Sequence, residues 1–137
     1  MRFKKGSAGF TLLEILIVIV ILGVVAGLAI PVFTSNIQKA QAQEAMASLA
    51  AIRNALQTYY VMQPAQTYTG ASLSPAAAGF IGYDPTATAA GQTLHFTYSL
   101  NVVTGSTYTV TASNTAGTAG TVVIDQAGTV TRTGAYA

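Results

Sequence analysis

The stretch GFTLLEILIVIVILGVVAGLAIPVF, residues 9–33, decides the fold of the N-terminal part of this chain. It contains a single charged residue, Glu14, and the next 24 residues, 15–38, carry no charge. At about 1.5 Å per residue, a helix of this length matches a bilayer core of about 30 Å. The sequence therefore predicts a helix over residues 10–34 that lies in a membrane or in another apolar environment.

The nine residues before this block, MRFKKGSAG, are basic and end in small residues. Under the positive-inside rule this flank stays in the cytoplasm, so the chain after the helix lies outside it. An ordinary cleaved secretory signal fits poorly, because its apolar region spans only about 7–15 residues. Its small residues also follow the apolar region, whereas here they precede it.

The helical pattern continues over residues 35–62, which contain neither glycine nor proline. Apolar residues recur there at spacings of four and three, which mark one face of a helix. These residues are Ala45, Leu49, Ile52, Leu56 and Tyr59. The opposite face carries Gln41, Glu44, Arg53, Asn54 and Gln57. Because Pro64 ends the pattern, we expect one helix from about Phe10 to Met62 with an amphipathic second half.

In the last third of the chain the period changes to two, which is typical of strands. The expected strands cover 94–100, 107–112, 121–125 and 129–133. The turn before the last strand places Gly128 where a hairpin needs a positive φ. We expect an α+β fold in which residues 63–137 form a loop and a four-stranded antiparallel sheet. One sheet face should cover the helix, the threonine-rich face should meet solvent, and residues 35–137 should form one globular domain.

Composition excludes several function classes. Only 7% of the residues are charged, against roughly 25% in ordinary soluble domains. Beyond residue 9 there are three basic and four acidic residues, so no basic patch indicates nucleic-acid binding. The chain has no cysteine, which excludes disulfides and thiolate metal sites. His95 has no acid–base partner nearby in sequence and is interpreted as a surface residue, so we expect no catalytic residue, metal or cofactor.

The junction Gly9-Phe10-Thr11-Leu12-Leu13-Glu14 and the following ILIVIVILGVVAGLAIP resemble the N-terminal region of type IV pilins and type II secretion pseudopilins. The resemblance covers about residues 4–62. It implies that a prepilin peptidase cuts between Gly9 and Phe10, N-methylates Phe10 and releases residues 1–9 as a leader peptide. The precursor would lie in the bacterial inner membrane with its N-terminus in the cytoplasm. The inner-membrane assembly machinery would then add it to a homo-oligomeric filament at the cell surface or in the periplasm.

Glu14 is the one charge in the apolar block, and a carboxylate in a membrane helix costs about 2.5–3.5 kcal/mol. Cleavage after Gly9 would release a cationic amine at Phe10. In a bundle of parallel helices, Glu14 of one subunit could pair with this amine of the next, which would fix the axial register. The resemblance implies the same pairing. The alternative is a glutamate near the helix end that extends its carboxylate to the membrane surface.

Three further residues in the block bear on helix packing. Gly23 and Gly27 form a GxxxG pair, which allows close approach of two helices. Together with Pro31 they weaken one helical segment, since glycine and proline cost about 1 and 3 kcal/mol relative to alanine in helix interiors. The resemblance implies partial unwinding of residues 23–31 in an assembled filament, and the alternative is a bend at Pro31.

Two departures from the family pattern concern the C-terminal half. Many type IV pilins close a C-terminal loop with a disulfide, which is impossible here. Major pseudopilins often bind calcium there, but Asp125 is the one acid after Asp84, and calcium takes about 6–8 oxygen ligands. We predict a pilin precursor, the structural subunit of a type IV pilus-like filament. The alternatives are a type II secretion or competence pseudopilin and, from another class, a non-polymerising membrane-anchored adhesin or binding module.

Overall fold

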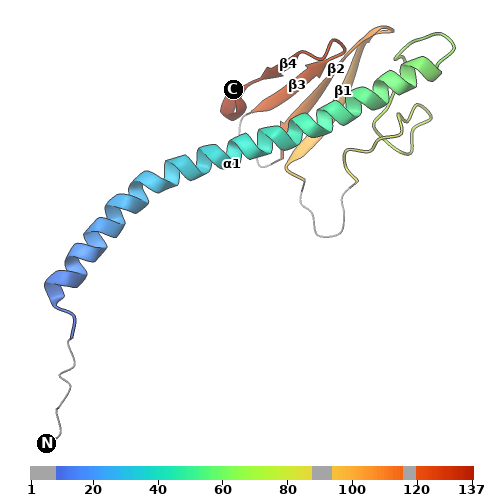
Figure 1. Ribbon diagram of the computed structural model, residues 1–137. Coiled ribbons are helices and arrows are strands. Elements are labelled where there is room, and N and C mark those ends of the chain that lie inside the picture. Colours follow the sequence, from blue (N-terminus) through green and yellow to red (C-terminus); the bar gives the residue numbers. More distant parts are fainter. Residues whose placement is uncertain (1–8, 88–93, 116–119) are drawn as a thin grey trace, which may run out of the picture. The chain divides into compact units, whose positions relative to one another are not determined.

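The computed structural model describes residues 9–87, 94–115 and 120–137. A single long helix precedes a four-stranded sheet and a short C-terminal turn (Figure 1). The elements are α1 (Leu12–Met62), β1 (Phe96–Thr104), β2 (Thr107–Asn114), β3 (Thr121–Asp125), β4 (Val130–Arg132) and the 3-10 turn η1 (Gly134–Tyr136). The α+β, type IV pilin-like fold expected from the sequence is confirmed. The chain divides into two compact units, residues 1–37 and 38–137, and we call the second the head unit.

The helix begins at a threonine cap. The backbone N–H of Glu14 donates to the Oγ1 atom of Thr11 at 3.2 Å, which satisfies one of the free donors of the first turn. From there α1 is continuous through Gly23, Gly27 and Pro31. It ends at Met62, two residues before Pro64, as the sequence predicts.

The strands form one antiparallel sheet in the order β1-β2-β3-β4. Leu100 pairs with Val110, which in turn pairs with Ile124, so apolar residues of neighbouring strands lie on the same face. The β3–β4 hairpin turns at Gly128, whose φ of 89° is the positive value expected from the sequence. Asp125 stabilises this turn, because its Oδ1 atom accepts a hydrogen bond from the backbone N–H of Thr129 at 2.8 Å.

The core of the head unit lies between one face of α1 and one face of the sheet. The buried residues of α1 are Ala42, Ala45, Leu49, Ile52 and Leu56. The sheet contributes Phe96, Tyr108, Val110, Ala112, Val122 and Ile124. Leu49, Ile52 and Leu56 are therefore covered as expected, whereas Tyr59 is only half-buried. The alternate residues of β1 and β2, such as Ser99 and Thr111, are exposed or half-buried, in keeping with a threonine-rich outer face.

The segment between α1 and β1 contributes an aromatic side chain to this core that the sequence did not indicate. Tyr68 is buried, and its ring centroid lies 4.7 Å from that of Tyr60 and 4.7 Å from that of Tyr108. Tyr68 also donates its backbone N–H to the Gly105 carbonyl oxygen at 2.7 Å. The segment is thus joined both to α1 and to the β1–β2 turn.

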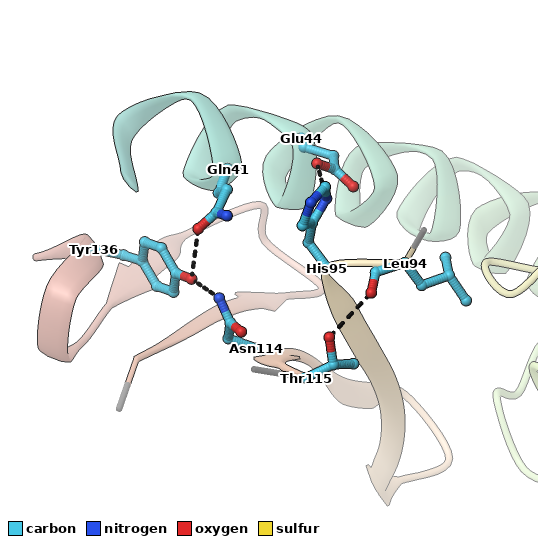
Figure 2. A network of polar contacts seen from close by, with 7 residues as sticks. All are labelled: Gln41, Glu44, Leu94, His95, Asn114, Thr115 and Tyr136. Atoms are coloured by element: carbon cyan, nitrogen blue, oxygen red, sulfur yellow. Dashed lines mark hydrogen bonds and ion pairs between the residues drawn. The ribbon is translucent and has the colours of Figure 1, made fainter. Parts of the chain in front are cut away.

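Polar contacts also join one turn of α1 to the residue before β1 and to the C-terminal turn, at the same end of the sheet (Figure 2). His95 Nδ1 lies 3.0 Å from Glu44 Oε2, just before β1 begins. At the C-terminus, Asn114 Nδ2 donates to the Tyr136 hydroxyl, which lies 3.5 Å from Gln41 Oε1. Tyr136 is buried and packs against Phe96, with ring centroids 5.5 Å apart. The C-terminal turn is therefore part of the folded head unit.

Candidate assembly site

The stem, which we define as residues 10–37, presents apolar side chains on all sides. Its large hydrophobic residues are between 46% and 83% exposed, from Val18 to Leu12. By length and composition α1 could cross a membrane. Burying apolar surface contributes about 25 cal/mol per Å², so this surface requires lipid or other protein around it.

The predicted cleavage and docking residues lie at the start of the stem. Gly9 and Phe10 precede α1, and the Phe10 side chain is 77% exposed. Residues 1–8, the rest of the expected leader, lie outside the described residues. Glu14 is exposed and occupies the third helical position after Thr11, where the macrodipole favours a carboxylate. The structure therefore places Phe10 and Glu14 at one end of the helix, and their pairing between subunits stays a prediction.

Thr11 is a residue that our reading of the sequence missed. Thr11-Leu12-Leu13-Glu14 has the spacing of a capping box, in which a threonine at the cap and a glutamate three residues later satisfy free backbone N–H groups. The bond from the Glu14 N–H to Thr11 Oγ1 forms one half of it. Glu14 thus has a local structural role besides the predicted docking role, and experiments must separate the two.

The two glycines of the stem are not required by packing against any other residue that the structure describes. A Cβ atom built on Gly23 or Gly27 would have no heavy atom within 4 Å outside the backbone of its own helix. A larger residue would therefore fit here, and close approach of a second helix at these glycines stays a prediction. The backbone of residues 23–31 is helical here. Unwinding in an assembled filament stays a prediction.

Charges in the head unit are few and mostly engaged. Glu44 contacts His95, and the Arg53 guanidinium donates to the Gln126 carbonyl oxygen at 3.3 and 3.4 Å. Hydrogen bonds from the Thr129 backbone hold the pKa of the Asp125 carboxyl below its ordinary value. Within residues 9–87, 94–115 and 120–137, no three His, Cys, Asp or Glu side chains gather in a way that could hold a metal ion.

Comparison with known proteins gives two family matches. A model described as the prokaryotic N-terminal methylation motif matches residues 4–30. A model described as "Type IV minor pilin ComP, DNA uptake sequence receptor" matches residues 31–123, which is more than half of the chain. The first covers the predicted cleavage junction, and the second runs from Pro31 into β3.

Individual relatives match mainly through the N-terminal region. The type II secretion system core protein G of Escherichia coli K12 is 48% identical over 59 residues, which are 43% of this chain and 41% of that protein. Its counterpart from Aeromonas hydrophila is 46% identical over 56 residues, or 41% of this chain and 39% of that protein. The chain thus spans about two fifths of the length of these relatives.

A longer match is found with a fimbrial protein. The type IV major fimbrial protein FimA of Dichelobacter nodosus is 32% identical over 103 residues, which are 71% of this chain and 66% of FimA. No solved structure matches the chain. The prepilin junction, the fold of α1 and the sheet, and the family model over residues 31–123 agree. The chain belongs to the type IV minor pilin ComP family.

Proposed function

We propose that the chain is made as a membrane-anchored precursor, cut between Gly9 and Phe10, methylated at Phe10 and assembled into a type IV pilus-like filament. The observation that carries the proposal is the stem, whose large hydrophobic residues are 46–83% exposed in the part of the chain that the structure describes. A membrane covers such a helix in the precursor. Other stems would cover it in the filament, with Glu14 of one subunit beside the Phe10 amine of the next.

A pseudopilin role is the second candidate, because the core protein G relatives are 41–51% identical to this chain over their matched N-terminal regions. The stem gives no means of choosing, since both kinds of filament would be built from it. The DNA uptake role in the family description belongs to the proteins that carry that name. The head unit of this chain contains three Lys or Arg residues and three Asp or Glu residues, so its net charge does not favour binding to a phosphate backbone.

The test is electron microscopy of material sheared from cells that express the chain, with immunogold labelling of the head unit. Long labelled surface filaments would support the pilin. Processed chain found only in short periplasmic filaments would support the pseudopilin. Processed chain that stays as single copies in the membrane would contradict filament assembly and favour a lone anchored module.

A further inference from the structure

The head unit carries a cationic side chain that has no polar partner among the residues that the structure describes. Lys39 lies on the exposed side of α1 and makes no hydrogen bond or ion pair with the residues that the structure describes. The remaining basic groups of the head unit are engaged. His95 contacts Glu44, Arg53 binds the Gln126 carbonyl oxygen, and Arg132 lies 2.8 Å from the Met46 sulfur.

Asp84 offers a carboxylate whose second oxygen, Oδ2, accepts no hydrogen bond from the residues that the structure describes. Its Oδ1 atom accepts the Thr86 hydroxyl at 2.6 Å and the Thr86 backbone N–H at 2.8 Å. These bonds hold the pKa of Asp84 below its ordinary value, so the group is charged at neutral pH. Both bonds end on one oxygen, whereas a carboxylate has about four acceptor positions. The loop thus fixes the carboxylate in place and leaves part of it available.

Asp84 also lines a cleft of about 290 Å³ between the α1–β1 segment and β1. The apolar part of its lining comes from Leu73, Pro75, Pro85 and Tyr98, and Ser74 and Thr86 add hydroxyl groups. Such a cleft suits a lysine side chain. The methylene stem can lie along the apolar lining while the ammonium group reaches the carboxylate, with an aromatic ring nearby to favour the cation.

We propose that the Asp84 cleft of one copy receives Lys39 of a neighbouring copy in the filament. This inference rests on the proposed assembly and deepens it by naming a contact between heads. Lys39 and Asp84 form no ion pair within one chain. Once residues 1–9 are removed, Lys39 is the one Lys or Arg residue of the described chain without a polar or sulfur contact. Each copy carries one of each group, so the contact repeats head to tail along an open filament.

Charge reversal in the full chain tests the pairing. Lys39→Glu alone and Asp84→Lys alone replace an attraction by a repulsion at every added subunit, so filament yield should fall about fivefold or more. The double variant Lys39→Glu/Asp84→Lys restores opposite charges and should recover most of the yield. Yield is measured as sheared filament protein relative to processed chain in the membrane.

Two controls separate charge from folding. Asp84→Asn keeps an oxygen that can accept the Thr86 bonds but removes the charge, so its yield should fall while the processed chain keeps its level and its thermal melt. Gln57→Glu and Gln57→Lys change the net charge by one unit elsewhere on the exposed side of α1, and they should leave the yield unchanged.

Carbodiimide cross-linking gives a direct measurement. In filaments assembled from a mixture of isotopically light and heavy chains, a Lys39–Asp84 cross-link should join light and heavy peptides. Wild-type filaments without this cross-link, together with full yield from both single reversals, would overturn the head contact and leave filament assembly intact. A wild-type chain that forms no filaments at all would overturn the proposed function and the contact with it.

Discussion

The Nδ1 atom of His95 lies 3.0 Å from the Oε2 atom of Glu44, which joins the start of β1 to α1 across 51 positions of sequence. Both side chains are nearly half exposed, at 46% and 45%. An exposed pair of this kind contributes at most about 1 kcal/mol. The one histidine of the chain is therefore a surface residue, as the sequence predicts, and its ring contacts the Glu44 carboxylate.

The first prediction concerns processing. Replacing Gly9 by leucine should leave an uncut membrane precursor, because a bulky residue keeps the backbone from the peptidase. Gly6→Leu should still be cut, since the expected cleavage follows Gly9. The intact mass of the membrane-bound chain shows for each variant whether residues 1–9 have been removed. A wild-type chain that retains Met1 or begins after Ala29 would contradict cleavage between Gly9 and Phe10.

The second prediction separates the two roles of Glu14. Glu14→Leu and Glu14→Gln should both be inserted and cut after Gly9, yet give few or no filaments. Removing one partner of a buried ion pair typically costs about 3–5 kcal/mol, and here the loss recurs at each subunit. Glutamine can still complete a capping box, so its failure would point to the charge.

Thr11→Ala serves as the matched control for Glu14. It removes the cap bonded to the Glu14 N–H, which costs about 1 kcal/mol of helix stability, but it keeps the carboxylate. Filament yield relative to processed chain is the measurement for all three variants. Normal filaments from Glu14→Gln would show that the charge does not set the register, and the carboxylate would then merely reach the membrane surface.

The third prediction concerns the core of the head unit. Ile52 is fully buried between α1 and the sheet, so Ile52→Ala should lower the free energy of unfolding by about 2–5 kcal/mol. Asn54→Ala, on the exposed side of the same helix, should change it by no more than about 0.5 kcal/mol. Denaturant unfolding of the detergent-solubilised chain, followed by tyrosine fluorescence, compares them. Equal effects would contradict the packing of α1 on the sheet.

The fourth prediction concerns alkaline pH. Burial raises the pKa of the Tyr108 hydroxyl to about 12, against about 10 for an ordinary tyrosine. Because folding favours the neutral form, its contribution to stability is complete below pH 10 and is lost as the pH rises through about 12. Tyrosinate absorbance should show one late-titrating group that is absent from Tyr108→Phe. Titration of every tyrosine near pH 10 in the folded chain would contradict the burial.

Local patterns were sufficient to predict the elements of this fold. The four-and-three spacing of Leu49, Ile52 and Leu56 places them on one helix face, and the alternation around Val110 indicates a strand. Gly128 likewise indicates the β3–β4 hairpin from local sequence alone, because few residues other than glycine adopt a positive φ. These signals act over a few residues and need no knowledge of the rest of the chain.

Contacts between distant residues could not be predicted in this way. Glu44 and His95 are each ordinary surface residues in their own segments, and Tyr68 sits in a stretch with no period at all. Only the packing of the α1–β1 segment against α1 and β2 brings Tyr68 beside Tyr60 and Tyr108. The Thr11 cap is different, since the spacing of Thr11 to Glu14 is a local pattern that can be recognised in the sequence.

The buried Tyr136 accepts a hydrogen bond from Asn114 and lies near Gln41. These contacts bear on the redox conditions in which the head unit can fold. Tyr136 closes the C-terminal end by packing and hydrogen bonding alone, in a chain without sulfhydryl groups. Folding therefore needs no oxidant and no disulfide isomerase, and reducing agents have no bond to break. The head unit should reach the same folded state in the presence and absence of dithiothreitol, so its production is independent of the oxidising machinery on which disulfide-closed pilin heads depend.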